Sequence, residues 1–391
     1  MVNIKKLTAR MIIFICNLLP LKKNKVFMFN YYGSGYGCNP KYISDFLLNN
    51  YPGGQFDIVW AFYDSTDNSY PDSIRKVKTM SIRYFYELCT SKVVITNFRT
   101  TDFFVKRKNQ YYIQTWHSSL RLKQIERDAE NVLPVNYVKM AKRDSLKCDL
   151  LLSGCKYSTD IFKKSFWYDG EIFEHGTPRN DLLFKNDLEL KKTVKRKLNV
   201  PTESKVLLYA PTFRKDNDLS VYDLNYSRLC EKLKSRFGGD WIVLVKLHPH
   251  LMSKADQSPP GVNVFDVTDY EDIQELLLIA DVLITDYSSL MFDFSITKRP
   301  CFLYVPDLEE YTNKDRKLYF QLNELPFINA VSNDELFDKL EQFDKAGYHG
   351  NLKEFLTKIG SFEKGRAAEH LTHRLEDICF GKRRGEMDEA V

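Results

Sequence analysis

Short apolar runs alternate with helical patterns along the whole chain. In the first half, the runs that predict strands lie at 25–29, 56–62, 93–96, 111–115 and 149–153. The helical patterns between them lie at 41–49, 82–89, 137–146 and 159–166. Strands that are separated by helices pair in parallel and need helical cover on both faces. The pattern therefore predicts an α/β fold built on parallel sheets.

The second half repeats this alternation after a lysine-rich helical stretch at 186–199. Its predicted strands lie at 205–210, 241–247, 262–265, 281–285 and 300–305. Its predicted helices lie at 222–237, 271–279 and 289–295, with a last helix at 367–378. A chain of 391 residues is too long for one simple core. We expect two Rossmann-like domains that face a cleft, at 25–190 and 200–380, with their junction near 185–204.

The first 24 residues have a different character and predict an amphipathic segment that associates with a membrane. No Asp or Glu precedes Asp45, and basic residues lie on both sides of an apolar run at 11–20. That run is well short of the roughly 20 residues that span a bilayer. A signal peptide and a surface helix packed on the first domain are the alternatives. We expect an interfacial helix at 1–24 that lies on an anionic leaflet.

Composition and spacing argue against several classes of protein. The eight cysteines are scattered and form no CxxC or Cys/His spacing, which indicates core thiols in a reducing, cytosolic compartment and no metal. No Walker sequence and no GxGxxG motif at a strand end is present, and no cofactor is expected. The net charge of +5 is mild and the basic residues form no stripe, so nucleic acid is not an expected partner.

Two polar runs follow predicted strands in the second half. They are Lys-Leu-His-Pro-His at 246–250 and Thr-Asp-Tyr-Ser-Ser at 285–289. Ligands of open α/β sheets bind beyond the carboxyl ends of the strands. A basic residue, an imidazole and two hydroxyls in that position indicate a phosphate-bearing ligand. The alternatives are that Asp286 or a serine only caps the following helix, that Lys246 pairs with a carboxylate, and that His250 is incidental.

Three further side chains are candidates for the same site. His117 follows the strand at 111–115. Arg214 follows the strand at 205–210, and Thr212 lies between that strand and Arg214. The planar guanidinium of an arginine suits a phosphate, while a structural His117 and a surface Arg214 are the simpler readings. Arg179 follows a Gly-Thr-Pro turn at 176–178, and we expect Arg179 and Asp181 to order a corner between the domains.

Taken together, five runs resemble the CDP-glycerol glycerophosphotransferase family, the teichoic acid primases and polymerases. The runs are Gln-Thr-Trp-His at 114–117, Gly-Thr-Pro-Arg-Asn-Asp at 176–181, Ala-Pro-Thr-Phe-Arg at 210–214, Lys-Leu-His-Pro at 246–249 and Thr-Asp-Tyr-Ser-Ser at 285–289. The resemblance covers most of residues 90–380 and implies a two-domain GT-B fold. The family usually continues Trp-His with Gly-Thr-Pro, whereas this chain has Ser118, Ser119 and Leu120.

The resemblance also implies roles for these residues. His117 matches the family's general base, and His248 matches its phosphate-contacting histidine, so both are expected to be catalytic. Arg214, Ser288 and Ser289 match donor-binding positions. The other residues expected to bind substrate are Thr212, Lys246, Asp286 and Arg179.

The expected reaction is transfer of glycerol phosphate, or another polyol phosphate, from a CDP-polyol to a hydroxyl of an acceptor, with release of CMP. The partners are CDP-glycerol or CDP-ribitol, a polyprenyl-diphosphate-linked glycan of the cell wall or capsule, and an anionic membrane surface at the cytoplasmic face of the cell membrane. A GT-B glycosyltransferase that uses a nucleotide sugar is the alternative enzyme. A non-catalytic membrane-surface binding module is the alternative outside enzymes.

Overall fold

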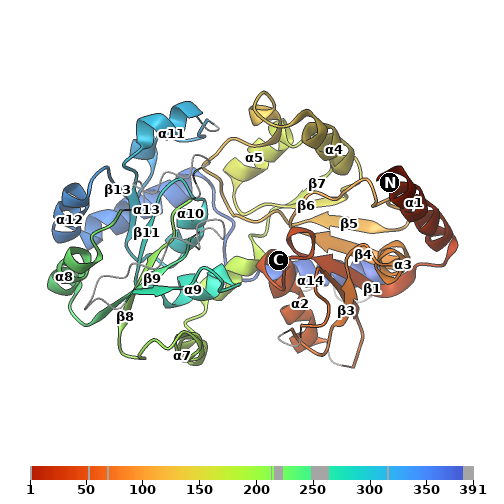
Figure 1. Cartoon of the computed structure of the whole chain (residues 1–391), viewed down its shortest axis with the longest axis horizontal. Helices are drawn as coiled ribbons and strands as arrows, with labels where there is room; N and C mark the ends of the chain where they lie inside the picture. The colour runs from red at the N-terminus through yellow and green to blue at the C-terminus, as the bar shows by residue number, and fades with distance from the viewer. Residues whose placement is uncertain are drawn as a thin grey trace, which may run out of the picture. The chain divides into compact units, whose positions relative to one another are not determined.

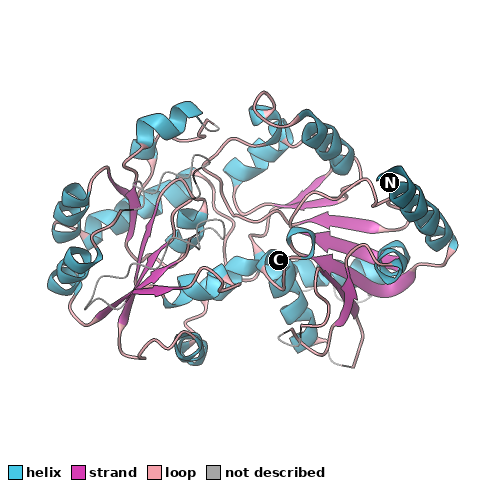
Figure 2. Cartoon of the chain, in the orientation of Figure 1, coloured by secondary structure: helices cyan, strands magenta, loops and turns pink. Residues whose placement is uncertain are grey.

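The chain folds into two α/β units, each with its own parallel sheet (Figures 1 and 2). The computed structural model describes residues 2–51, 53–67, 70–212, 214, 223–247, 264–314 and 317–381. Unit 1 consists of Met1–His117, Glu126–Asp181 and the chain from Phe362 onward. Unit 2 consists of Ser118–Ile125 and Leu182–Ser361.

In the described part of unit 1, seven strands form one parallel sheet in the order β3-β2-β1-β4-β5-β6-β7. Their bounds are β1 Lys22–Phe29, β2 Asp57–Phe62, β3 Arg75–Lys78, β4 Ser91–Thr96, β5 Tyr111–Gln114, β6 Leu150–Leu152 and β7 Glu171–Phe173. The strand order reverses between β1 and β4. Such a switch point opens a crevice at the carboxyl ends of the strands.

Helices cover both faces of this sheet, as the continuous apolar runs of its strands require. Alternate residues of β1 enter different cores: Val26 and Met28 pack with α2 and α14, and Phe27 and Phe29 pack with the α3 side. The helices of unit 1 are α1 Val2–Leu18, α2 Cys38–Asn50, α3 Ile82–Thr90, α4 Val135–Ser145, α5 Lys156–Ser165, α6 Asp181–Phe184 (at the boundary with unit 2) and α14 Ala367–Phe380. The 3-10 turns within the described residues are η1 Tyr31–Gly33, η2 Glu126–Ala129, η3 Pro178–Asn180 and η6 Leu322–Glu324, the last in unit 2.

Unit 2 repeats the arrangement around a six-stranded parallel sheet, counted over its described residues, in the order β10-β9-β8-β11-β12-β13. Its strands are β8 Lys205–Tyr209, β9 Trp241–Val245, β10 Val264–Asp266, β11 Val282–Thr285, β12 Cys301–Tyr304 and β13 Ile328–Ala330. Its helices are α7 Leu188–Lys197, α8 Tyr226–Phe237, α9 Ile273–Ile279, α10 Leu290–Ser295, α11 Leu308–Lys314, α12 Asn333–Glu341 and α13 Lys345–Lys358. Here the switch point lies between β8 and β11.

Two of the differences between the units and the expected domains, at 25–190 and 200–380, arise from the way the chain crosses between the units. The helix α14 belongs to unit 1, because its apolar face places Leu371, Leu375 and Cys379 in the core that β1 and α2 line. The segment Ser118–Ile125 belongs to unit 2, where it pairs with residues 317–319. Both differences come from contacts between residues that are far apart in the sequence, which local patterns do not reveal.

The amino-terminal segment forms α1, and one face of it packs on unit 1. Ala9, Ile13 and Cys16 lie in a small core with Phe85 and Cys89 of α3. This contact is the one that the alternative of a packed surface helix expects, and it uses only one face of α1. The opposite face of α1 stays exposed, however, with Phe14 67% and Leu18 72% accessible to solvent. Among the described residues, no helix has both the length and the apolar character needed to cross a membrane.

Candidate active site

At the switch point of unit 2, the loops that follow β8 and β11 are held together by one carboxylate. Asp286 follows β11 and accepts hydrogen bonds from the backbone N–H of Thr212 at 2.9 Å and from its hydroxyl at 3.0 Å. The Nη1 atom of Arg214 donates to the same carboxylate at 2.9 Å. Burial raises the pKa of Asp286, and the charge of Arg214 opposes that rise. Asp286 therefore joins the two loops and does not cap α10, whose N-cap residue is Ser289.

Arg214 is clamped by a second carboxylate from the loop after β12. Its Nε atom donates to Asp307 at 2.6 Å and its Nη2 atom donates to the other oxygen of Asp307 at 3.2 Å. The guanidinium also lies 5.0 Å from the ring centroid of Tyr287 and 4.8 Å from that of Tyr311. Burial alone would lower the pKa of Arg214, but the two carboxylates outweigh it and raise the pKa above its usual value. Arg214 is thus a protonated, buried side chain that links the loops after three strands, and it is not the surface residue that was the alternative.

The two serines that follow lie half-buried beside this cluster. The hydroxyl of Ser288 accepts from the N–H of Leu290 at 3.3 Å. The hydroxyl of Ser289 accepts from the N–H of Leu122, in the segment that joins unit 2 from the first half of the chain, at 3.4 Å. Because α10 has only six residues, we assign any ligand contact here to these hydroxyls and not to a helix dipole.

Lys246 lies just beyond β9, and its ammonium is turned toward the backbone. It donates to the carbonyls of Thr268 at 2.9 Å and Tyr270 at 2.7 Å, and more weakly to that of Val267. Burial lowers the pKa of this lysine, opposed by nearby aspartates. The hydrogen-bond partners of Lys246 are therefore backbone carbonyls, whereas the alternative considered from the sequence was an ion pair with a carboxylate. His248 and His250 lie outside the described residues.

His117 lies at the corresponding edge of unit 1, just beyond β5. Its ring stacks on that of Trp116, with 4.7 Å between the centroids, and lies 6.2 Å from the ring of Tyr31, which follows β1. Trp116 adopts a left-handed backbone conformation, with φ of 51°, that turns the chain sharply out of the strand. The N–H of Trp116 donates to the side-chain oxygen of Gln114 at 2.9 Å.

A buried asparagine links this turn to Arg179. Asn39, at the start of α2, donates from Nδ2 to the carbonyl of Thr115 at 3.3 Å and to that of Trp116 at 3.1 Å. Its Oδ1 accepts from the N–H of Arg179 at 3.0 Å. The structure thus brings Arg179 and the His117 turn together in unit 1, with Arg179 part of this edge and not of the cluster in unit 2.

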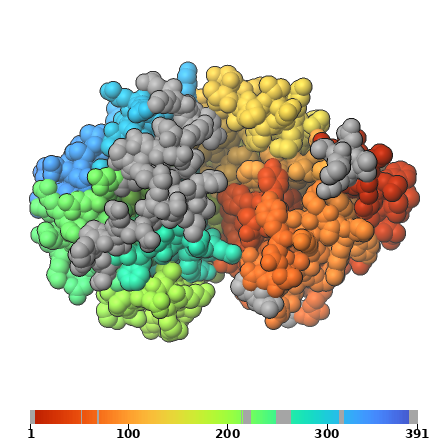
Figure 3. All heavy atoms as spheres, viewed as in Figure 1, coloured from red at the N-terminus to blue at the C-terminus, as the bar shows by residue number. Residues whose placement is uncertain are grey.

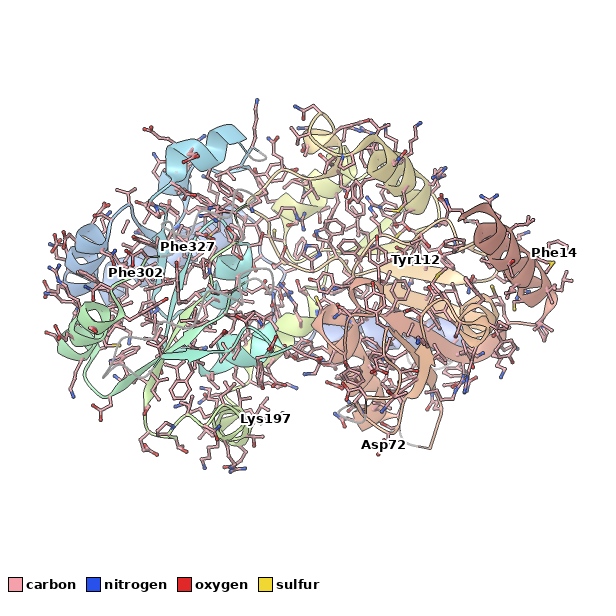
Figure 4. The ribbon with its side chains drawn as sticks, in the orientation of Figure 1. Phe14, Asp72, Tyr112, Lys197, Phe302 and Phe327 are labelled. Atoms are coloured by element: carbon pink, nitrogen blue, oxygen red, sulfur yellow. The ribbon has the colours of Figure 1, made fainter. Side chains whose placement is uncertain are left out.

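A buried polar network lies beneath the same turn. Gln114 donates to the hydroxyl of Tyr112 at 3.0 Å, and that hydroxyl donates to Asp144 of α4 at 3.3 Å. Asp144 also forms an ion pair with Arg99 at 3.3 Å. The side chain of Arg99 is almost wholly buried. Figure 4 labels Tyr112, whose side chain lies on the sheet side that faces α4. The turn that carries His117 is therefore supported by a hydrogen-bonded network of buried polar side chains.

The site residues predicted from the sequence fall into two groups. Unit 1 holds His117 and Arg179, while unit 2 holds Thr212, Arg214, Asp286, Ser288 and Ser289 around one switch point and Lys246 beyond the neighbouring strand. Sequence reasoning missed Asn39 and Asp307. The Asn-Pro pair at 39–40 was a usable signal for the first, because both residues are typical of helix starts. The described residues contain no cluster of His, Cys, Asp or Glu able to hold a metal ion.

Two α/β units, each built on a parallel sheet with polar loops at its switch point, give the chain a GT-B-like fold. The chain belongs to the CDP-glycerol:poly(glycerophosphate) glycerophosphotransferase family, whose model matches residues 11–377. This confirms the family resemblance inferred from the five runs. The wall teichoic acid polymerase TagF, as a His-to-Asn variant with CDPG, has the same fold: the TM-score is 0.81 at 31% identity, over 92% of this chain and 90% of that chain.

Two curated relatives differ in how much of their length this chain spans. It is 33% identical to a teichoic acid glycerol-phosphate transferase of Staphylococcus aureus, over 94% of this chain and 97% of that protein. It is also 33% identical to a teichoic acid poly(glycerol phosphate) polymerase of Staphylococcus epidermidis, over 89% of this chain. The chain spans only half of the length of that polymerase, 50%.

Proposed function

We propose that this protein transfers glycerol phosphate, or another polyol phosphate, from a CDP-polyol to a hydroxyl of a polyprenyl-diphosphate-linked glycan, with release of CMP. The observation that carries the proposal is the family match over residues 11–377. It is supported by the polar loops that this family's runs form at the switch point of unit 2. The TagF relative was studied with CDPG, and CDP-glycerol is the donor we propose first, with CDP-ribitol as the second.

In this mechanism the acceptor oxygen attacks the phosphorus that bears the glycerol, in line with the CMP oxygen that leaves. Phosphoryl transfer of this kind depends on positioning and on charge stabilisation. His117 takes the proton of the attacking hydroxyl, because an imidazole titrates near neutral pH and this one lies half-buried just beyond a strand end. Trp116 and Asn39 hold that imidazole in place.

The donor diphosphate is bound by unit 2. The hydroxyls of Ser288 and Ser289 contact the phosphate oxygens, and the Arg214–Asp286 pair fixes the loops that carry them. Thr212 belongs to the same tie through its hydroxyl and its N–H. His248 contributes by family likeness, and Lys246 shapes the loop at 267–270 through its carbonyl contacts.

We further propose that the outward face of α1 associates with the cytoplasmic surface of an anionic membrane. The exposed apolar side chains recur every three to four residues along it and are Leu7, Met11, Phe14, Ile15 and Leu18. Exposed Lys6, Arg10, Lys22 and Lys23 lie close to this stripe in the sequence. In Figure 3, α1 forms a dark red edge of unit 1, and Figure 4 shows Phe14 pointing away from the body of that unit. An apolar stripe with basic neighbours suits the headgroup region of anionic lipid.

The released nucleotide tests the proposed reaction. Purified protein is incubated with CDP-glycerol, CDP-ribitol or a UDP-sugar and with a prenyl-diphosphate-linked disaccharide, and the nucleotides are separated by chromatography. We expect CMP, formed from a CDP-polyol only when the acceptor is present. UDP from a UDP-sugar would instead support a glycosyltransferase. No turnover and no affinity for any of the nucleotides would support a binding module.

A further inference from the structure

The segment that follows His117 crosses into unit 2 and is fixed there by its backbone. The N–H of Tyr319 donates to the carbonyl of Leu122 at 2.7 Å, and the N–H of Gln124 donates to that of Lys317 at 2.8 Å. Between these bonds, Lys123 and Leu318 form an antiparallel bridge. Leu122 also donates to the hydroxyl of Ser289. The backbone of Lys123 is therefore held beside a loop that we assign to the donor site.

The side chain of Lys123 reaches the aromatic pair that also packs on Arg214. Its ammonium lies 5.0 Å from the ring centroid of Tyr311. Tyr311 stacks on Tyr287 with 3.8 Å between centroids and 10° between planes, and Tyr287 lies in the loop between Asp286 and the two serines. Burial raises the pKa of Asp286, and the charges of Arg214 and Lys123 both oppose that rise. Lys123 is thus close enough to act electrostatically on the cluster.

The charge of the cluster explains why a second cation belongs there. All three guanidinium nitrogens of Arg214 donate to Asp286, Asp307 or Thr212. The single positive charge of Arg214 faces two acidic side chains, so it is largely offset within the cluster and does little to attract a diphosphate. Lysine is a flexible point charge that binds phosphate well.

We propose that Lys123 is a donor-binding residue whose ammonium contacts the diphosphate of the CDP-polyol. This inference rests on the proposed function and adds to it a residue that neither the sequence runs nor the family comparison assigned. It also places a donor contact six residues after the proposed base, on the segment where this chain departs from the usual Gly-Thr-Pro continuation.

Calorimetric titration of the full chain with CDP-glycerol, CDP and cytidine tests the inference. Lys123→Met keeps the aliphatic stem and removes the charge, and Lys123→Arg restores a cation. We expect Lys123→Met to weaken binding of CDP-glycerol and CDP by about 10- to 100-fold, the range for a lost charge-assisted hydrogen bond, and to leave cytidine affinity within about twofold. Lys123→Arg should recover most of the affinity. The control is Lys353→Met on the exposed side of α13, which should bind all three ligands as the parent does.

Two results would overturn the inference while the proposed function stands. In one, Lys123→Met binds CDP-glycerol as tightly as the parent protein. In the other, it loses cytidine and CDP-glycerol equally, which indicates a damaged pocket and not a lost phosphate contact. If the parent protein itself neither binds nor turns over CDP-glycerol, the proposed function fails and the inference fails with it. Melting temperatures of both Lys123 variants show whether each is folded.

Discussion

Asn39 donates a hydrogen bond to the carbonyl of Trp116 at 3.1 Å and so joins the start of α2 to the turn that presents His117. The same side chain accepts from the N–H of Arg179. Three segments that are far apart in the sequence therefore meet at one amide. This makes the geometry of the proposed base dependent on a residue that takes no part in the chemistry.

Replacing His117 by alanine should lower turnover by two to four orders of magnitude, the usual contribution of a positioned general base. CDP-glycerol affinity should stay close to that of the parent, because we assign the donor to unit 2. CMP release at saturating CDP-glycerol measures the first effect and calorimetry measures the second. His373→Ala, on the exposed side of α14, is the matched control. Normal turnover of His117→Ala would remove His117 from the mechanism.

Asn39→Ala should destabilise unit 1 and reduce turnover with little change in donor affinity. It leaves two buried carbonyls and one buried N–H without the amide that now bonds them, which costs about 1–3 kcal/mol. Urea unfolding gives the stability change. The control is Asn50→Ala at the exposed end of the same helix, where the amide bonds only the carbonyl of Phe46 among its described contacts. Equal losses in the two variants would contradict a special role for Asn39.

Asp286→Asn should destabilise the protein by about 3 kcal/mol, near the lower end for breaking a buried ion pair, because Arg214 keeps Asp307 as a partner. Chemical denaturation measures this change. Asp240→Asn breaks an exposed pair with Lys234 and should leave the stability close to that of the parent. A smaller loss for Asp286→Asn than for Asp240→Asn would show that the buried tie does not hold the loops.

Unit 1 should lose stability as the pH falls below about 6.5, in part through His370. Burial, and then the neighbouring His175 at 4.7 Å between ring centroids, lower the pKa of His370. The unfolded chain then takes up the proton more readily than the folded one, so the stabilising contribution is present above pH 6.5 and is lost below it. Between pH 7 and pH 5.5, His370→Gln should show a shallower loss of stability than the parent in denaturation curves. His373→Gln leaves the stacked rings of His370 and His175 in place and should change the slope much less, because His373 contributes the smallest of the charges that lower the pKa of His370.

Phe14→Ser combined with Leu18→Ser should reduce flotation with anionic vesicles while leaving the melting temperature unchanged, since both side chains point away from the core. Point substitutions are sharper than removal of residues 1–23, because removal would also uncover Phe85 and Cys89 of α3. The control is Leu146→Ser, which replaces a still more exposed apolar residue after α4. Vesicle binding that does not change in the double variant would rule out α1 as the docking surface.

The strands and helices that the sequence predicted are those with strong apolar periodicity. For example, the prediction of a strand at 205–210 corresponds to β8 at Lys205–Tyr209, and the helix predicted at 82–89 corresponds to α3 at Ile82–Thr90. The missed strands β3, β7 and β13 have only three or four residues and mix polar with apolar side chains. Such strands are stabilised by their neighbours in the sheet, and a local pattern does not predict them.

The sequence predicted where the site residues lie in the fold, but it did not predict which of them contact one another. Strand ends place Asp286 and Arg214 at the same sheet edge, which the alternation of strands and helices indicates. Arg214 pairs with Asp286 at a sequence separation of 72, and with Asp307, which completes the clamp, at a separation of 93. Charge pairing over such separations leaves no periodic signal, so the sequence predicts a cation at this edge but not the two carboxylates that hold it.

The packing of α14 has a consequence for how the protein is made. The core of unit 1 includes Leu371 and Leu375, which follow all of unit 2 in the chain. During synthesis, unit 2 can therefore reach its final structure while the sheet of unit 1 still lacks one of its covering helices. Until α14 has been synthesised, the apolar side chains of β1 and α2 that it covers stay exposed. The nascent chain is most prone to aggregation at that surface.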